Sequence, residues 1–368
     1  MSQPTHTAQK TMTTKPTKTA PAKDLKAKAL KAKASAVKVV VVKLATVKPT
    51  KKAPTNEAKA VKTVKSAASA VRPLRLFQVK VDAQAPSDPH CEPFTLPTGG
   101  SLPLIAGMRL LSQDLSLQSS ALWGLLPADF TPRTGLDSTS LGQAIAASPG
   151  FDVYFCHAHP ELESVYHNPW LQAETTHPHF LVLAREFLKA ADLPDTPLDN
   201  LSHSSLFATG HLIVASPAFW ADYLAFIETA LSQVHLKIGK TARAALFDEQ
   251  TPAGKFSYLY LIVARLLGHF LIAKANTWKA CKLALPQDSE LNPHLRLLRE
   301  MKDNAVTQQS RWLTACWANY RALYFSQTLG KSWIANNLAA ISPKVLKFGP
   351  AVPGITYAYP RTTEGASV

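Results

Sequence analysis

The polar residues between Asp152 and His179 are the ones in this sequence whose types and spacing could do chemistry. Five of the chain's twelve histidines fall within these 28 residues, together with several carboxylates, an asparagine and a tryptophan. Imidazole and carboxylate groups bind metal ions, move protons and hydrogen-bond sugar hydroxyls, so two kinds of site fit this composition. The residues concerned are Asp152, His157, His159, Glu161, Glu163, His167, Asn168, Trp170, Glu174, His177 and His179.

One interpretation of this stretch is a metal site. His157 and His159 form one His-x-His pair, and His177 and His179 form a second pair about 20 residues later. Neutral imidazoles with a carboxylate such as Glu174 can hold zinc or manganese. Under this interpretation His157 and His159 are the first candidates for metal ligands.

The second interpretation is a polar pocket without a fixed metal. Asp152 or Glu174 would then hydrogen-bond sugar hydroxyls or act as a base, and Trp170 would offer an apolar platform. The alternative to both sites is a surface loop in which the histidines are incidental and Trp170 belongs to the core. The other expected substrate contacts are Asn168, His177 and His211.

Apolar runs on either side of this stretch predict the strands that must position it. Residues 151–156 form a continuous apolar run between a Pro-Gly turn and a polar loop, which is typical of a strand covered on both faces. Residues 211–215 form a second run of this kind, and residues 74–81 alternate as in a half-buried strand. Because ligands of open α/β sheets bind beyond the carboxyl ends of strands, the loop after residue 156 is the expected site.

Helical patterns alternate with these strands, so the sequence predicts an α/β sheet covered by helices. We expect an α/β domain over residues 73–290 and a helical segment over residues 291–368 packed on it. Arg296, Arg299 and Lys302 recur every three residues in that segment, which indicates a solvent-exposed helix face. The other interpretation is that these cations and the aromatic residues after them bind a nucleotide by charge and stacking. The predicted helices cover residues 138–147, 178–191, 256–275 and 291–328, with another beginning at Pro217.

A series of short motifs carries a family resemblance over residues 74–330. Its order resembles that of uncharacterised bacterial glycosyltransferase-like proteins from surface-polysaccharide loci. The resemblance implies a nucleotide-sugar-transferase-like fold that uses a nucleotide-activated sugar and a glycan acceptor, with Glu174 as the base and Asp152 as a donor or ion contact. The motifs are Asp152-Val153-Tyr154-Phe155, Pro160-Glu161, Tyr166-His167-Asn168-Pro169-Trp170, Glu174-Thr175-Thr176-His177-Pro178 and Gly210-His211-Leu212-Ile213-Val214-Ala215-Ser216-Pro217-Ala218-Phe219-Trp220.

The sequence departs from metal-dependent nucleotide-sugar transferases at one place. Those enzymes usually have an Asp-x-Asp motif after the strand, which holds a divalent ion such as Mn²⁺ or Mg²⁺. This chain has Cys156-His157-Ala158-His159 there. Either a histidine replaces the ligand, or the ion is absent, or catalysis is lost, and the sequence leaves open whether the protein is an enzyme.

The charge of the 368-residue chain is concentrated in its first 72 residues. That segment holds 16 lysines and Arg72 against Asp24 and Glu57, whereas the remainder has 23 basic and 23 acidic residues. Residues 10–66 contain no aromatic residue, so we expect residues 1–72 to be disordered. The lysine, alanine and proline composition resembles the tails of linker histones.

A flexible lysine-rich tail predicts salt-dependent binding to DNA or another polyanion, or to an anionic membrane surface. A solubilising leader without a specific partner is the other interpretation of the tail. If the tail carries the function, the protein is a non-enzymatic, histone-like DNA-binding or nucleoid-associated protein. The lysines expected to make the polyanion contact are Lys26, Lys28, Lys31, Lys33, Lys51 and Lys52.

The remaining motifs restrict compartment and reaction class. The four cysteines form no Cys-x-x-Cys pair, and the first apolar run, Val39–Val42, is too short for a signal peptide. We therefore expect a cytoplasmic protein, either free or associated with the nucleoid or a membrane surface. Residues 259–273 are too short and too charged to span a bilayer, so no transmembrane segment is expected. The chain also lacks the P-loop, GxGxxG, HExxH and GxSxG motifs.

Overall fold

The computed structural model describes residues 72–80, 88–117, 121–247, 256–342, 347–349 and 355–358. The predictions made for residues 1–71, including the disordered tail, therefore lie outside the described residues. The same holds for the expected polyanion contacts Lys26, Lys28, Lys31, Lys33, Lys51 and Lys52.

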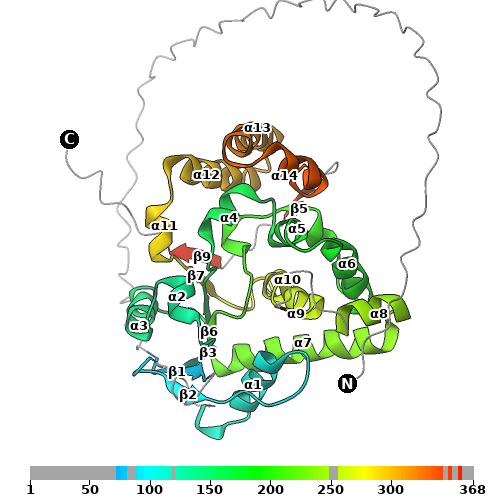
Figure 1. The fold of residues 1–368 in the computed structure, drawn as a ribbon. Coiled ribbons are helices and arrows are strands. Elements are labelled where there is room, and N and C mark those ends of the chain that lie inside the picture. The colour runs from blue at the N-terminus through cyan, green and yellow to red at the C-terminus, as the bar shows by residue number, and fades with distance from the viewer. Residues whose placement is uncertain are drawn as a thin grey trace, which may run out of the picture. The chain divides into compact units, whose positions relative to one another are not determined.

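Within the described ranges, a mixed sheet of seven strands forms the centre of the body (Figure 1). Its order is β2-β1-β3-β6-β4-β7-β9. Strand β6 is antiparallel to both neighbours, whereas every other pairing is parallel. The carboxyl ends of the other six strands and the amino end of β6 therefore share one edge. The strands are β1 (Leu74–Val79), β2 (Glu92–Phe94), β3 (Leu122–Leu126), β4 (Val153–Phe155), β6 (Ile213–Ala215), β7 (Ala280–Leu283) and β9 (Ile355–Ala358).

Apolar side chains pack against both faces of the sheet, because successive strand residues point to opposite sides. In β3, Trp123 and Leu125 belong to one core cluster, and Leu122 and Leu126 belong to the other. Helices α1, α6, α7, α9 and α10 contribute to the first cluster, and α2 and α3 to the second. These helices are α1 (Pro103–Ser112), α2 (Phe130–Thr134), α3 (Ser138–Ala147), α6 (Phe180–Ala190), α7 (Pro217–Lys237), α9 (Tyr258–Val263) and α10 (Leu266–Ala273).

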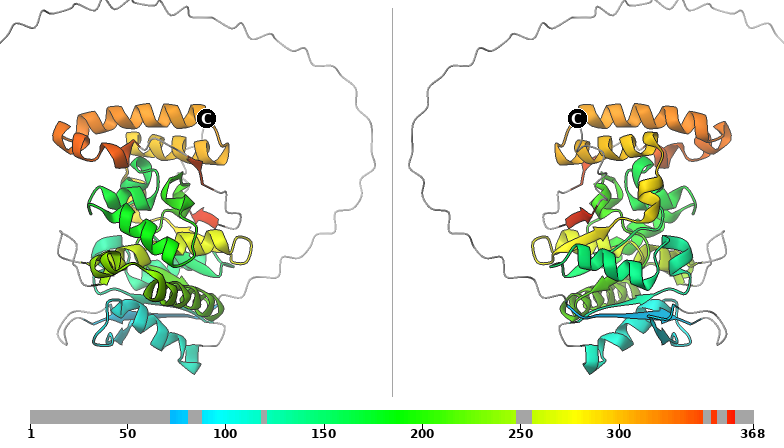
Figure 2. Two further views of the ribbon diagram at one scale, coloured as in Figure 1. Left: turned by 90° about the vertical axis from the view of Figure 1, so that its right-hand side faces the viewer. Right: turned by 90° about the vertical axis from the view of Figure 1, so that its left-hand side faces the viewer.

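A third apolar cluster lies under the C-terminal helices. Helices α12 and α13 pack on each other, and α12 packs on α4. Figure 2 shows α13 as the outermost layer of the body. The remaining elements are α4 (Pro160–Val165), α5 (Pro169–Glu174), α8 (Lys240–Phe247), α11 (Pro286–Glu290), α12 (Pro293–Thr307), α13 (Arg311–Thr328), α14 (Lys331–Asn336), α15 (Leu338–Ile341), the 3-10 helices η1 (Leu115–Leu117), η2 (Thr196–Leu198) and η3 (Ser204–Leu206), and the parallel pair β5 (Asn200–Leu201) and β8 (Lys347–Phe348).

The predicted α/β architecture is confirmed, with revisions of its parts. The helix expected over residues 256–275 is two helices, α9 and α10, and the pattern over 291–328 is divided between α12 and α13. Helix α3 is capped by Asp137, whose carboxylate accepts the backbone N–H of Ser140 at 2.7 Å. Ser138, the first residue of the helix, donates its hydroxyl to Asp88.

The C-terminal segment is not purely helical, contrary to the prediction from the sequence. After the helices the chain returns to the sheet as β9, which pairs in parallel with β7. The short apolar segment Ile355–Ala358 could not be distinguished from a loop in the sequence, because its pairing partner lies about 75 residues away. None of the helices in the described part of the chain combines the length and apolar character needed to span a bilayer.

Candidate functional site

The edge where β3 and β4 end and β6 begins brings three separate segments together. Residues 127–133 follow β3, residues 156–161 follow β4, and residues 210–212 precede β6. The backbone N–H of Cys156 donates to Leu212 O at 3.2 Å, which joins the second and third segments. Because ligands of open α/β sheets bind at such an edge, its polar groups are the first candidates for a site.

An open cation and an open carboxylate follow β3. Asp129 is the residue before the short helix α2, and Arg133 lies in the last turn of that helix. Their closest side-chain atoms are 3.7 Å apart, and the side chains are 63% and 35% exposed. Gly210 lies next to Arg133, since a Cβ at Gly210 would be 4.0 Å from Arg133 Nη2. Gly210 has φ +92°, a conformation that favours glycine, and its N–H donates to Ala264 O. The chain therefore turns tightly beside the guanidinium.

His211 is buried at this edge, and it has spare hydrogen-bonding capacity. It is 2% exposed, and neither ring nitrogen has a hydrogen-bond partner among the described residues. Burial lowers the pKa of His211 to about 4, so the imidazole is neutral at pH 7. A neutral imidazole offers one donor and one acceptor, and a buried group of this kind without partners is unusual in a folded protein.

One aromatic ring adjoins His211, and a second ring stacks on the first. Tyr260 meets His211 edge to face at 5.8 Å between ring centroids. Phe256 stacks on Tyr260 at 4.7 Å with an interplanar angle of 13°, and Phe256 is 43% exposed. Burial raises the pKa of Tyr260, with Arg133 opposing and Asp129 adding to the effect. Because Arg133 and Asp129 both affect the pKa of Tyr260, the aromatic pair lies near α2. The position of Gly210 beside Arg133 agrees with this.

The loop after β4 separates the two histidines of the predicted metal site. His159 is exposed and pairs with Glu161 at 3.4 Å. His157 points inward, 1% exposed, with Nδ1 at 3.2 Å from Glu163 Oε1. Burial lowers the pKa of His157, although Glu163 partly opposes this. In the parts of the chain that the structure describes, no group of three or more histidine, cysteine, aspartate or glutamate side chains could hold a metal ion.

Glu161 is the exposed carboxylate of this loop. Burial by itself would raise its pKa, but the hydrogen bond from His159 and the charges of nearby histidines lower it below the ordinary value. Glu161 is therefore ionised at neutral pH. It stands in the first turn of α4, directly after the strand, where the sequence predicts site chemistry.

The inward-facing groups of the same loop form a junction of buried charges. Lys282 of β7 makes an ion pair with Glu163, and both side chains are at most 1% exposed. Burial alone would raise the pKa of Glu163, but Lys282 and His157 hold it at about 2. Arg299 pairs with Asp288, and Tyr357 Oη lies 3.0 Å from Asp288 Oδ1 and 3.3 Å from Glu163 Oε2. We call Glu163, Lys282, Asp288, Arg299 and Tyr357 the buried junction.

Lys302 extends this junction, contrary to the prediction for its helix. Its ammonium donates to Glu163 O and to Tyr166 O, and burial lowers its pKa to about 8. The three-residue spacing of basic side chains had indicated an exposed face of α12. Arg296 is exposed, but Arg299 and Lys302 are 4% and 0% exposed, because that face packs on α4 and meets the buried carboxylates.

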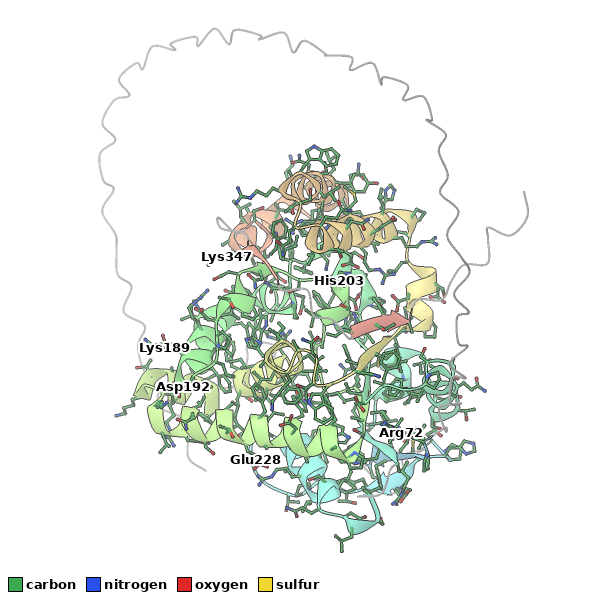
Figure 3. The ribbon with its side chains drawn as sticks, turned by 180° about the vertical axis from the view of Figure 1, so that it is seen from behind. Arg72, Lys189, Asp192, His203, Glu228 and Lys347 are labelled. Atoms are coloured by element: carbon green, nitrogen blue, oxygen red, sulfur yellow. The ribbon has the colours of Figure 1, made fainter. Side chains whose placement is uncertain are left out.

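Asp152, a predicted catalytic residue, lies at the opposite edge of the sheet. It precedes β4, so its carboxylate stands at the amino end of the strand, where it accepts the N–H of Lys279 at 3.1 Å and lies 3.6 Å from Arg72 Nη1. In Figure 3, His203 lies beneath the C-terminal helices, and Arg72 lies lower in the body. The structure thus separates Asp152 from the loop after β4.

Glu174 and Asn168 cap helices, so their polar atoms are used within the fold and do not line an open site. The carboxylate of Glu174 accepts the backbone N–H groups of His179 at 3.3 Å and Leu181 at 2.7 Å, which caps the start of α6. Asn168 is fully buried. It caps α5 through Leu171 N and donates to two carbonyls, Leu198 O at 3.0 Å and Asn200 O at 2.8 Å.

Trp170 is a core residue and not an open platform. It is 2% exposed, stacks on Phe180 at 6.0 Å and meets His269 edge to face at 5.1 Å. His177 is partly buried, and its Nδ1 has no hydrogen-bond partner in the described ranges. Burial, followed by the charge of Arg265, lowers the pKa of His177.

Of the predicted site residues, the structure brings His157, His159 and His211 to the carboxyl edge, with the side chain of His157 turned inward to Glu163. It adds four that the sequence interpretation missed. The signal for two of them was present, because the apolar run Trp123–Leu126 is followed directly by Pro-Ala-Asp, as a strand followed by a polar turn would be. The residues that were missed are Asp129, Arg133, Phe256 and Tyr260. No family model, no curated protein and no solved structure matches this chain.

Proposed function

We propose that the body is a glycosyltransferase-like enzyme that uses a nucleotide-activated sugar at the edge formed by the ends of β3 and β4. The observation that carries the proposal is His211, a buried imidazole without partners beside open groups of three kinds. These are a cation, a carboxylate and a stacked aromatic pair. Convergent polar groups next to apolar surface are what a small-molecule site offers. We call Asp129, Arg133, His211, Phe256 and Tyr260 the open edge.

The chemistry of a nucleotide-sugar fits each group of the open edge. A guanidinium binds phosphate oxygens in a fork, so Arg133 suits the diphosphate. The exposed face of Phe256 suits stacking on a base or a sugar ring. His211 can donate to one hydroxyl or carbonyl and accept from another.

A divalent ion fits this edge only together with the donor. Magnesium is usually held by one or two carboxylates plus substrate phosphates, and Asp129 would supply such a carboxylate. Mg²⁺ or Mn²⁺ bound there would neutralise charge on the diphosphate. The histidine pair is not suited to this task, because His157 faces Glu163 and His159 faces solvent.

In the proposed reaction an acceptor hydroxyl attacks the anomeric carbon of the donor sugar. A carbon–oxygen bond forms to the acceptor, the bond from the anomeric carbon to the phosphate oxygen breaks, and a nucleoside diphosphate leaves. Glu161 replaces Glu174 as the candidate base that takes the hydroxyl proton, because it is ionised and exposed at the same edge. Arg133 stabilises the charge that develops on the leaving diphosphate.

A thermal-shift screen of the full chain against nucleotide-sugars, with and without Mn²⁺ or Mg²⁺, tests this function. A donor at 100 times its dissociation constant should stabilise the protein by about 2.7 kcal/mol. Arg133→Ala should abolish the shift. The matched control is Arg109→Ala, since Arg109 is 51% exposed and paired with Glu228 elsewhere on the body. If no donor raises the melting temperature, or if Arg133→Ala responds like the wild type, the proposal is wrong.

The charge of the first 72 residues supports a second candidate function, binding of DNA or another polyanion. Each lysine that contacts a phosphate contributes to the salt dependence of binding. Replacing Lys26, Lys28, Lys31, Lys33, Lys51 and Lys52 by glutamine in the full chain should weaken binding to random-sequence DNA and flatten its salt dependence. Mobility shifts at several salt concentrations measure both effects. Unchanged binding by this variant would contradict a role for the tail.

A further inference from the structure

Helix α13 exposes apolar side chains along its outer side. Trp312 is 72% exposed and Leu323 is 61% exposed. They are eleven positions apart, close to three full turns, so they lie on the same side of the helix. The residues that share this side with them are Ala315, Asn319 and Ala322, which are also exposed. We call these five residues the outer face of α13, the outermost layer of the body in Figure 2.

The inner side of α13 carries the groups that a surface helix normally turns to solvent. Arg321 is 4% exposed. It donates to Val165 O at 3.1 Å and to Ile341 O, and its guanidinium lies 4.3 Å from the centre of the Trp317 ring. Trp317 in turn donates to Ser164 O at 3.0 Å. The inner side of α13 therefore packs on the body and hydrogen-bonds to it, whereas the outer face is free to contact a partner.

The charge around the outer face selects the kind of partner. The sequence has no acidic residue from 304 to 363, and the exposed basic side chains among the described residues of this range are Arg311, Lys331 and Lys347. Arg311 at the first position of α13 and Lys331 at the first position of α14 are exposed at the two ends of this face. The first 72 residues add a charge of +15 to the same molecule. An anionic surface is therefore favoured.

We propose that the outer face of α13 docks on the surface of a membrane that contains anionic lipids. Trp312 and Leu323 enter the boundary between headgroups and acyl chains, where tryptophan is enriched. Arg311 and Lys331 contact lipid phosphates at the ends of the helix, and the basic tail adds long-range attraction. This docking goes beyond the proposed function and does not depend on it.

The same observations disfavour the other occupants of this face. A second copy of the chain would bring two strongly positive molecules together, which is unfavourable. A nucleic acid would need basic side chains on the contact face itself, and Arg321 is turned inward. A lipid surface accepts apolar side chains and cations side by side, which is the arrangement of α13.

Flotation of the full chain with vesicles tests the proposal. Vesicles of phosphatidylcholine alone are compared with vesicles that also contain phosphatidylglycerol. Replacing Trp312 and Leu323 together by serine should lower affinity for the mixed vesicles about tenfold or more. The matched control replaces Leu115 and Leu236 by serine, since these leucines are 79% and 80% exposed on other elements. Equal binding by both double variants overturns the proposal.

Two further measurements separate lipid docking from other contacts. Raising the salt concentration screens the tail, so the difference between the two double variants should persist when overall binding weakens. Brominated lipids should quench part of the tryptophan fluorescence of the wild type, and Trp312→Phe should remove that part. If the serine variant instead abolishes self-association or DNA binding and leaves vesicle binding unchanged, the occupant is a second copy or a nucleic acid, and the proposal is wrong.

Discussion

Glu163 and Asp129 are both carboxylates beside a basic side chain, but Glu163 is fully buried whereas Asp129 is 63% exposed. In the buried junction, the charged atoms of Glu163, Lys282, Asp288 and Arg299 all have charged partners. At the open edge, the side chains of Asp129 and Arg133 approach to 3.7 Å and are 63% and 35% exposed.

The difference follows from the cost of removing a charge from water. A buried ion without a partner costs several kcal/mol, so the junction tolerates its charges only when they are paired. Those pairs join α4 to β7 and α11 to α12, and Lys302 adds a second contact from α12. The hydroxyl of Tyr357 connects β9 to the same groups. At the open edge, the backbone turns at Gly210, and both ring nitrogens of His211 have no hydrogen-bond partner among the described residues. Groups with spare hydrogen-bonding capacity can bind a ligand, whereas groups that are already paired hold the fold.

Removing one charge from the junction should cause the largest loss of stability. Glu163→Gln leaves the ammonium of Lys282 buried without its counter-charge, and we expect the free energy of unfolding to fall by about 3–5 kcal/mol. Urea denaturation measures this loss.

The matched control is Asp192→Asn, which breaks an exposed pair with Lys237 and should cost about 0–1 kcal/mol. Equal losses in the two variants would show that the junction does not stabilise the fold, and would remove the contrast between the two regions.

The second-largest expected loss of stability comes from lowering the pH, which protonates the buried histidines. Burial lowers the pKa of His211 and of His269 to about 4, so the unfolded chain takes up their protons first as pH falls below 6.5. The stability that each neutral imidazole contributes is present above pH 6.5 and is lost as pH falls toward 4. For each histidine this amounts to about 2–3 kcal/mol at pH 4.5.

Replacing His211 by phenylalanine should therefore flatten the decline of stability between pH 7 and pH 4.5 by that amount. His269→Phe should do the same, because its side chain is buried in a similar way. Denaturant titrations at several pH values provide the measurement. An unchanged acid profile in both variants would contradict the burial of neutral imidazoles at these positions.

The smallest expected change in stability comes from Arg133→Ala. Its contact with Asp129 is long, at 3.7 Å, and both side chains reach solvent, so the free energy of unfolding should change by no more than about 1 kcal/mol. Stability and nucleotide-sugar binding should thus separate at the open edge, with binding lost and the fold kept. A loss of several kcal/mol in the same denaturation assay would place Arg133 among the structural charges.

Local patterns in the sequence predicted much of the architecture. Strand β4, strand β6, helix α3 and helix α6 follow from apolar periodicity and from turn residues next to them in the chain. Other elements are too short for their apolar pattern to predict them from the sequence. Strand β7 has only four residues, Ala280–Leu283, and includes a lysine whose burial depends on Glu163, more than a hundred residues away. Such a strand is stabilised by its partners and not by its own pattern.

The candidate site divides in the same way. The sequence by itself determined that polar residues follow the strand ending at Phe155 and that the positive charge lies in the first 72 residues. Only the tertiary structure decided that His157 faces Glu163 while His159 faces solvent, that Trp170 belongs to the core, and that the open aromatic ring is Phe256. The physical reason is that residue type and spacing depend on neighbours along the chain. Burial and pairing, by contrast, depend on segments such as α2 and α9, which approach His211 only when the sheet has formed.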